Sequence, residues 1–438
     1  MRLTVIDTGY LGATHAACMA AIGHDVLGVD VDPDRISALR AGQTPFYEPG
    51  LSELLKEQID LGRLRFTDSY EQAAAFGEVH FLCVGTPQRA DDGAADLRYV
   101  DAAIDSLAPH LDRPCLVVGK STVPVGTADR LTERLAAAAP VGAAAALAWN
   151  PEFLREGFAI DDTLRPDRLV FGVSPKSPGA EAVMREVYAP LAPEPPLLVT
   201  DLMTAELVKV SANSFLATKI SFINAMAEVC EAVGADVVQL SKALSYDARI
   251  GGLFLNAGVG FGGGCLPKDI RAFQARADEL GVGQALHFLR EVDAVNLRRR
   301  ERVVRLAAEL CGGDPAGHRI AVWGAAFKPN SDDIRDSPSL DVASQLHALG
   351  AEVSVYDPKA MDNARKLRPQ LEYATDAVAA AQGADVLLLL TEWREFRDID
   401  PADVAAVASQ RAVIDGRNAL DRPRWEAAGW TFRALGRP

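Results

Sequence analysis

The sequence has few cysteines and none of the spacings that metal sites require. Its six cysteines are spread over 438 residues, with no C-x-x-C pair and no cysteine–histidine pair at zinc-ligand spacing. We therefore expect no metal site. Sparse cysteines are typical of proteins in a reducing compartment, so the expected location is the cytoplasm.

An excess of positive charge and long apolar runs are also absent. The formal net charge of −15 argues against nucleic acid or an anionic membrane surface as a partner. A phosphate-bearing small molecule stays possible, because it needs only a local cluster of cations and backbone N–H groups. The alanine-rich run 135–149 contains Pro140 and Gly142 and is too short to span a bilayer. The N-terminus lacks the apolar stretch of a signal peptide.

The rest of the composition is that of a large globular protein, with 49% hydrophobic and 24% charged residues, and the length suits two or three domains. Short apolar segments alternate with helical patterns in the first 172 residues and again from Arg319, which predicts doubly wound parallel sheets. The stretch Met203–Val233 has helical character without Pro or Gly, and the Pro-rich stretch Ala189–Leu198 marks a boundary before it.

The predicted fold class is therefore α/β, with two Rossmann-like doubly wound domains joined by a long central helix. The predicted domains cover residues 1–198, 199–310 and 311–438. The predicted strands are Leu3–Ile6, Val26–Val29, Val79–Val84, Leu116–Gly119, Ala145–Trp149 and Leu169–Gly172, then Arg319–Trp323, Glu352–Tyr356, Val386–Leu390 and Ala412–Ile414.

A glycine turn follows the first predicted strand. The segment Asp7-Thr8-Gly9-Tyr10-Leu11-Gly12 has the second and third glycines of the G-x-G-x-x-G dinucleotide fingerprint. Asp30 ends the second strand about 20 residues on, where a carboxylate binds ribose hydroxyls and repels a 2′-phosphate. The segment predicts a site for NAD rather than NADP, although Arg35 leaves that preference open. A plain tight turn is the alternative.

Asp7 departs from the fingerprint. Aspartate tolerates unusual backbone angles better than most residues, so we expect the turn to survive. At ~7 Å and an effective dielectric of ~20, each like-charge pair with a pyrophosphate costs about 2 kcal/mol. The substitution therefore predicts weaker cofactor binding, unless the carboxylate points away into solvent.

A second glycine run, Gly258–Gly264, leads into Cys265. Such a run is a poor helix or strand and exposes N–H groups that can hold a phosphate or an oxyanion. Cys265 comes directly after it, and Lys268 follows three residues later, which suits a reactive thiolate. The alternative is a flexible loop with an incidental thiol.

Other polar segments follow predicted strands or line the long helix. Asn150–Gly157 and Lys120–Pro124 each begin where a strand ends, which is where α/β sites gather, although either could be a simple helix start. Lys209, Asn213 and Asn224 share one stripe of the long helix and need buried partners there. A substrate or a structural network could supply those partners.

Taken together, these residues resemble the UDP-glucose/GDP-mannose dehydrogenase family over nearly the whole chain. The landmarks are Gly9–Gly12, Tyr47–Leu51, Val84–Pro87, Lys120–Pro124, Asn150–Phe153, Phe261–Cys265 and Ala326–Pro329.

The resemblance implies an NAD-binding first domain, a last domain that binds a UDP-sugar, and oxidation of UDP-glucose at C6 to the acid with two NAD. Cys265 would form a thiohemiacetal and then a thioester with the sugar carbon. The other implied catalytic residues are Lys209, Asp269, Asn213, Thr122 and Glu156. The implied cofactor-binding residues are Gly9, Tyr10, Leu11, Gly12, Asp30, Arg35, Thr86, Thr122, Glu156, Lys268 and Arg335. The implied substrate-binding residues are Glu152, Phe153, Leu154, Lys209, Asn213, Arg249, Phe261, Gly262, Cys265, Phe327, Lys328 and Arg417.

The resemblance also implies a homodimer or larger assembly, because Arg249 looks like a residue that reaches the neighbour's substrate. Three alternatives stay open. The substrate could be GDP-mannose or UDP-N-acetyl-mannosamine. The reaction could be a two-electron oxidation of a hydroxy acid, which would not need Cys265. The chain could also be a nucleotide-sugar-binding protein that Asp7 has disabled as an enzyme.

Overall fold

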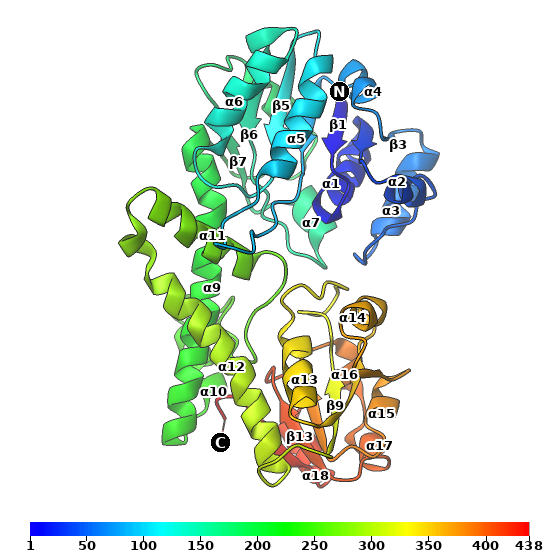
Figure 1. Ribbon diagram of the computed structural model, residues 1–438, viewed down its shortest axis with the longest axis vertical. Helices are drawn as coiled ribbons and strands as arrows, with labels where there is room; N and C mark the ends of the chain where they lie inside the picture. The colour runs from blue at the N-terminus through cyan, green and yellow to red at the C-terminus, as the bar shows by residue number, and fades with distance from the viewer. Residues whose placement is uncertain (438) are drawn as a thin grey trace. The chain divides into compact units, whose positions relative to one another are not determined.

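The computed structural model describes residues 1–437, and the chain forms two compact units. The first unit consists of Met1–Ala212 and Ala275–Gly283, and the second of Asn213–Gln274 and Gln284–Pro438. Each unit contains one β-sheet with helices packed against it, as Figure 1 shows. The finer division into three domains stays a prediction.

The first unit is built on an eight-stranded sheet in the order β3-β2-β1-β4-β5-β6-β7-β8. Strands β1 to β6 run parallel to one another. The bounds are β1 Arg2–Ile6, β2 Asp25–Val29, β3 Leu64–Thr67, β4 Val79–Leu82, β5 Cys115–Gly119, β6 Ala145–Trp149, β7 Leu169–Gly172 and β8 Leu197–Thr200.

Helices cover both faces of this sheet. One face packs against α1 (Tyr10–Ala21), α3 (Leu51–Asp60) and α8 (Ala180–Tyr188), and the other against α4 (Tyr70–Phe76), α5 (Arg98–Leu107) and α6 (Thr127–Ala138). Val5 lies in the first of these cores and its neighbour Ile6 in the second. Because both faces are buried, the strands are apolar throughout, which is why they stand out in the sequence. The remaining helices are α2 (Pro33–Arg40) and α7 (Ala159–Leu164).

The far edge of the first sheet differs from the expected parallel arrangement. Strand β7 pairs antiparallel with β6, and β8 runs parallel to β7. Helix α7, which has six residues, lies between β6 and β7. The Pro-rich stretch predicted as a boundary contributes part of β8, and β3 was also missed.

The predicted long helix is confirmed as α9, which spans 32 residues from Leu202 to Val233 and runs from the first unit into the second. It is followed by α10 (Val237–Ser245), α11 (Leu266–Glu279) and α12 (Phe288–Leu310). Within the second unit α9 packs on α12, where Ser221 Oγ donates to Val292 O at 2.6 Å. Three short 3-10 helices cover Ala108–His110, Gly142–Ala144 and Gly283–Leu286.

The second unit contains a six-stranded parallel sheet in the order β11-β10-β9-β12-β13-β14. Its core gathers Trp323, Phe396 and Trp425 between the sheet and its helices. The strands are β9 Arg319–Trp323, β10 Glu352–Tyr356, β11 Glu372–Tyr373, β12 Val386–Leu389, β13 Ala412–Asp415 and β14 Thr431–Ala434. The helices are α13 Pro338–Ala348, α14 Met361–Leu367, α15 Ala377–Ala380, α16 Arg394–Asp398, α17 Pro401–Ala405 and α18 Arg422–Ala427.

The predicted fold class is confirmed: two doubly wound α/β parts share one long central helix. Within residues 1–437, no helix combines the length and the apolar character that a membrane crossing needs.

Truncation of the second core tests how far stability depends on this packing. Leu388 on β12 is fully buried, so Leu388→Ala is expected to lower the free energy of unfolding of its unit by about 2–5 kcal/mol. The same change at Leu367, which is 47% exposed, is expected to cost less than about 1 kcal/mol. Urea unfolding followed by tryptophan fluorescence measures both. Equal effects would contradict the packing described here.

Candidate functional site

The glycine turn at the end of β1 keeps the geometry of a dinucleotide turn. Asp7 has φ +68° and its N–H donates to Val29 O at 2.9 Å, so an aspartate occupies the backbone conformation that usually favours glycine. Gly12 could not be replaced, because a Cβ there would lie 1.8 Å from the Asp7 carbonyl oxygen. Helix α1 begins at Tyr10, and the N–H groups of its first turn have no partner within the helix. The expectation that the turn survives is confirmed.

Asp30 lies beside this turn, buried at the carboxyl end of β2. Its Oδ2 accepts hydrogen bonds from Thr8 N at 2.8 Å and Thr8 Oγ1 at 3.0 Å, and from Arg35 Nη1 at 2.9 Å. Burial opposes ionisation, but the hydrogen bonds from Asp32 N, Thr8 and Arg35 outweigh it and hold the pKa of Asp30 below its usual value. Asp30 is therefore an anion in the position expected for a ribose-binding carboxylate.

Two loops that carry predicted residues meet after β4 and β5. Thr86 Oγ1 donates to Thr122 O at 2.8 Å, and Ser121 Oγ donates to Val84 O at 2.6 Å. Both loops leave the sheet at the carboxyl edge, so the structure brings together two of the residues predicted to contact the cofactor.

The segment between Thr122 and the start of α6 is held by Glu206, a residue that sequence reasoning missed. Glu206 on α9 accepts hydrogen bonds from Gly126 N and Ala128 N, each at 2.7 Å, and Arg276 donates to Val125 O at 2.8 Å. Burial raises the pKa of Glu206 to about 7. The only signal in the sequence is a carboxylate on an apolar face of the long helix.

Glu48 joins α1 to the segment that follows β6. Tyr10 donates a short hydrogen bond to Glu48, whose carboxylate also accepts from Gly157 N at 2.6 Å and Ala159 N at 2.8 Å. Glu156 precedes Gly157 and is buried. This contact gives the landmark Tyr47–Leu51 a structural purpose, which sequence reasoning had missed.

Lys209 lies among the residues expected to line the sugar pocket. Its Nζ is 2.8 Å from Glu152 Oε1 and 5.8 Å from the centre of the Phe153 ring, and the lysine is buried. Glu152 also accepts from Leu154 N at 2.8 Å, which fixes the turn of that segment. The structure therefore groups these predicted residues around one buried ammonium.

Lys120 forms a separate buried contact in the first unit. Its Nζ donates to Asn150 Oδ1 at 2.9 Å, and Tyr188 OH donates to the same oxygen at 2.5 Å. Burial lowers the pKa of Lys120 to about 8. These contacts tie the Lys120–Pro124 and Asn150–Gly157 segments to each other.

The glycine run before Cys265 owes its composition to close packing within the second unit. A Cβ at Gly262 would lie 2.2 Å from Asp336 O, and one at Gly264 would lie 2.2 Å from Arg335 Cζ. The expectation that the run exposes its N–H groups is only partly met. Phe261 N donates to Asn296 Oδ1 at 2.7 Å, and Gly263 N donates to Arg335 O at 2.9 Å, so these two are already bound within the protein.

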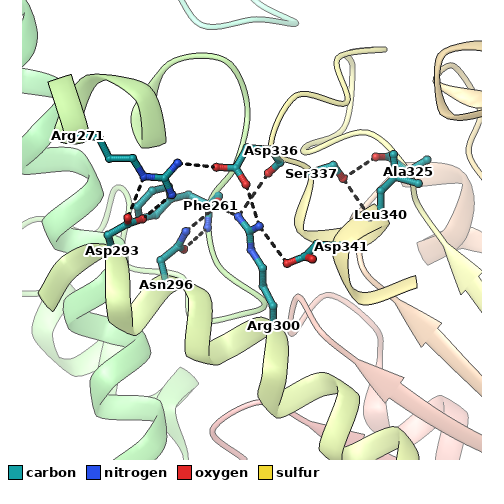
Figure 2. Close-up of polar contacts among 10 residues, drawn as sticks. All are labelled: Phe261, Arg271, Asp293, Asn296, Arg300, Ala325, Asp336, Ser337, Leu340 and Asp341. Carbon is teal, nitrogen blue, oxygen red and sulfur yellow. Dashed lines mark hydrogen bonds and ion pairs between the residues drawn. The ribbon is translucent and has the colours of Figure 1, made fainter. Parts of the chain in front are cut away.

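Two residues of α12 hold this loop, and Figure 2 shows their contacts. The Asn296 side chain accepts a hydrogen bond from Phe261 N at 2.7 Å and donates one to Phe261 O at 2.9 Å. The buried Arg300 donates to Phe261 O at 3.2 Å and to the carboxylates of Asp336 at 2.8 Å and Asp341 at 3.2 Å. Sequence reasoning missed both. Their spacing of four on the apolar face of a helix is the signal that could have found them.

Cys265 immediately precedes α11, and Asp269 N donates to its carbonyl oxygen at 2.9 Å. All six cysteines lie within the described residues, and Cys265 alone is exposed. In contrast, burial raises the pKa of Cys18 and of Cys83 to about 12. A helix N-terminus favours negative charge, which suits a thiolate at position 265.

Asp269, which follows Cys265 by four residues, contacts two other predicted residues, Lys268 and Asn213. It is buried and pairs with Lys268 Nζ at 2.7 Å, while Asn213 Nδ2 donates to its other oxygen at 2.6 Å. Asn224, on the same stripe as Asn213, instead accepts from Gly258 N at 2.9 Å. The polar stripe of α9 thus has protein partners, as a structural network requires.

The predicted substrate residues of the last domain lie around Phe327. Arg417 donates to Gly260 O at 2.9 Å and Phe327 O at 3.2 Å, and Lys328 Nζ is 5.3 Å from the Phe327 ring centre. Arg335 pairs with Asp333 at 2.7 Å. Their contacts with a substrate stay predictions.

Arg249 is not gathered with these residues. It is almost fully exposed and pairs with Asp247 at 2.7 Å, beyond the end of α10. Its role toward a neighbouring subunit stays a prediction. In the described part of the chain, no three His, Cys, Asp or Glu side chains are placed to hold a metal ion.

Comparison with known proteins shows the family to which this chain belongs. Three family models match in order: the NAD binding domain of the UDP-glucose/GDP-mannose dehydrogenase family over residues 1–192, its central domain over 203–298 and its UDP binding domain over 321–422. The chain belongs to the UDP-glucose/GDP-mannose dehydrogenase family. It is an NAD-dependent dehydrogenase, and the resemblance drawn from its motifs is confirmed.

Individual family members align with the chain from end to end. The UDP-glucose 6-dehydrogenase of Rhizobium meliloti (strain 1021) is 44% identical over 100% of both chains. The solved UDP-glucose dehydrogenase of Pyrobaculum islandicum superposes with a TM-score of 0.91 at 38% identity, covering 100% of this chain and 98% of its own. The UDP-D-ManNAc dehydrogenase of Pyrococcus horikoshii gives 0.86 at 28% identity, covering 100% and 99%.

Removal of the buried guanidinium should loosen the loop that carries Cys265. Arg300→Met leaves Asp336 and Asp341 without that partner and is expected to destabilise the second unit by about 3 kcal/mol. The matched change Arg298→Met removes a half-exposed side chain of the same helix and is expected to cost less than about 1 kcal/mol. Chemical unfolding measures both, and equal costs would contradict the anchoring role of Arg300.

Proposed function

We propose that this dehydrogenase oxidises UDP-glucose at C6 to UDP-glucuronate in two successive two-electron steps, with a covalent intermediate on Cys265. The observation that carries the proposal is the exposed thiol at the start of α11, close to Lys268 and the buried Asp269–Asn213 pair. A two-electron dehydrogenase of a hydroxy acid would have no use for that thiol.

The first unit has the features that NAD requires. Gly12 packs against the backbone of residue 7, α1 offers N–H groups for a pyrophosphate, and Asp30 is the anion for the ribose hydroxyls. By family resemblance, Thr86, Thr122 and Lys268 contribute further contacts. When bound, NAD supplies the acceptor for each hydride that leaves C6.

The proposed chemistry at C6 balances as follows. The alcohol loses a hydride and its hydroxyl proton to give an aldehyde. The Cys265 thiol then adds across the aldehyde C=O: the sulfur bonds to the carbon and the thiol proton goes to the oxygen, which gives a thiohemiacetal. Loss of a second hydride and the hydroxyl proton gives a thioester, and water cleaves its C–S bond to release the carboxylate and restore the thiol. Covalent capture keeps the reactive aldehyde from diffusing away.

By family resemblance, the other predicted catalytic residues have roles that match their chemistry. The Lys209 ammonium stabilises negative charge that develops on the C6 oxygen. Asn213 and Asp269 orient the reacting oxygen and the water, and Thr122 and Glu156 bind and activate that water for hydrolysis. By family resemblance, Glu152, Phe153 and Leu154 of the first unit bind the sugar. By the same resemblance, the substrate-binding residues of the second unit are Phe261, Gly262, Phe327, Lys328 and Arg417.

UDP-glucose is preferred to the sister substrates on the grounds of similarity. The relatives whose names specify UDP-glucose are closer in sequence than the solved structure whose name specifies UDP-D-ManNAc. GDP-mannose and UDP-N-acetyl-mannosamine stay the alternative substrates within the family.

Counting the cofactor reduced per sugar tests the reaction. With UDP-glucose limiting, two NADH per UDP-glucuronate are expected, with little turnover of GDP-mannose or UDP-N-acetyl-mannosamine. Cys265→Ser is expected to lower UDP-glucuronate formation at least about a hundredfold, because an alkoxide is harder to generate and a thioester cannot form. Cys115→Ser, which changes a half-buried thiol elsewhere, serves as the control. One NADH per sugar, or full activity of Cys265→Ser, would refute the thioester route.

We also propose that the active form is a dimer of this chain, joined along α9. Phe215, Phe222, Val229 and Val233 fall within about 40° of one another on the helix, and they are exposed, with Phe215 at 66% and Val233 at 71%. A continuous apolar stripe of this kind is unusual on a monomer. A two-fold axis lets the same stripe of a second copy cover it.

A charge on this stripe should separate the subunits. Phe222→Asp is expected to shift the protein from dimer to monomer, because each dimer would bury two carboxylates without partners. Sedimentation equilibrium measures the mass. Leu349→Asp, which puts the same charge on an exposed leucine of the second unit, is expected to leave the dimer intact. A dimer that survives Phe222→Asp would place the interface elsewhere.

A further inference from the structure

The side chain of Asp7 accepts hydrogen bonds from two backbone N–H groups, one in its own turn and one in the loop after β4. Its Oδ1 accepts a hydrogen bond from Gly9 N at 2.9 Å, and its Oδ2 accepts one from Gly85 N at 3.2 Å. These two N–H groups come from the loops after β1 and β4, at the carboxyl edge of the first sheet. The carboxylate therefore folds back onto the glycine turn instead of pointing into solvent.

A ligand phosphate needs the same kind of donor. The G-x-G-x-x-G turn binds a pyrophosphate because its backbone N–H groups are close to the ligand and not used within the fold. With a glycine at position 7 no side chain could reach Gly9 N from there. In this chain Gly9 N already has an anionic acceptor, which a bound diphosphate would have to replace.

The charge of Arg35 reduces the electrostatic repulsion between the Asp7 and Asp30 carboxylates but does not neutralise both of them. Arg35 Nη1 is 3.6 Å from Asp7 Oδ1 and 2.9 Å from Asp30 Oδ2, so one cation serves two carboxylates. The three groups together carry one excess negative charge at the mouth of the turn. A dinucleotide brings further negative charge to this place.

We propose that Asp7 is an intramolecular competitor of the NAD pyrophosphate: its carboxylate holds the amides of Gly9 and Gly85 in the empty enzyme and must leave them, or take up a proton, when NAD binds. This role rests on the NAD-binding domain and not on the identity of the sugar. It is also more specific than simple repulsion, because it assigns the effect to two shared hydrogen-bond donors.

The competition makes NAD affinity depend on pH. Burial raises the pKa of Asp7, whereas the pKa of Asp30 lies below its usual value. The other groups that face Asp7 do not titrate near neutrality: the pKa of Arg35 is raised, and those of Tyr70 and Cys83 are raised to about 12. A nearby diphosphate would raise the pKa of Asp7 further, so NAD binding takes up protons and tightens as the pH falls.

Calorimetric titration with NAD alone tests the proposal without any turnover. At pH 8, Asp7→Gly is expected to bind NAD about tenfold more tightly than the wild type, because it removes the charge and frees both amides. Asp7→Asn is expected to gain less, because its amide oxygen can still accept a hydrogen bond from Gly9 N. Both residues also accept the positive φ of position 7, so the turn is expected to form. The matched control is Asp34→Asn, which removes an exposed carboxylate nearby that contacts neither amide.

The pH arm isolates Asp7 from other groups. Lowering the pH from 8 to 5, toward the pKa range of a carboxyl group, is expected to tighten NAD binding by the wild type more than by Asp7→Asn. Glu206, whose pKa is about 7, is present in both proteins and cancels in the comparison. Equal affinities of wild type and both Asp7 variants at pH 8 would overturn the proposal. An equal gain in Asp34→Asn would also overturn it, because the effect would then be one of general charge.

Discussion

The loop that presents Cys265 depends on one buried cation. The Arg300 guanidinium reaches a carbonyl of the loop and two carboxylates at the start of α13, and the neighbouring Asn296 bonds the same loop residue through both its N and O. A buried ion pair adds little net stability compared with apolar packing, but it tolerates few alternative arrangements. Its value here is geometric: the loop backbone has one position in which all of these donors and acceptors are satisfied.

The same principle recurs in the first unit. Backbone N–H groups at loop ends bind side-chain carboxylates: Glu48 holds Gly157 and Ala159, Glu206 holds Gly126 and Ala128, and Asp7 holds Gly9 and Gly85. The first two pairs fix segments that carry predicted catalytic residues. The third pair lies where a ligand is expected. Glu48 and Glu206 therefore have a structural role, whereas Asp7 competes with the proposed binding of NAD.

Much of this architecture was predictable from local sequence. Strands buried on both faces, such as β1, β4 and β9, are continuous apolar runs, and α9 is a long stretch without Pro or Gly. The strands that were missed carry weaker signals: β8 follows a Pro-rich stretch, and β11 has only two residues. The reversal of β7 is a property of chain direction, which periodicity alone does not give. The candidate site residues were predictable where they belong to a local sequence motif, as Gly12, Asp30 and Cys265 do.

The contacts that position the site were not predictable in the same way. Asn296, Arg300, Glu48 and Glu206 act across large separations in sequence, and each resembles an ordinary polar residue in its own segment. The glycine run illustrates the limit. Its composition correctly indicated an unusual backbone, but the reason is that the Asp336 backbone and Asn296 leave no room for a side chain at Gly262 and Gly260.

The positive φ of residue 7 has an evolutionary consequence. Gly12 cannot change, because any side chain would meet the backbone, whereas position 7 accepts glycine, asparagine or aspartate without rebuilding the turn. The glycine codons GGU and GGC differ from the aspartate codons GAU and GAC by a single base. One nucleotide substitution can therefore convert a turn whose N–H groups are open to the cofactor into one whose N–H groups bind Asp7. The reverse substitution restores the first form, and the fold is unaltered in both.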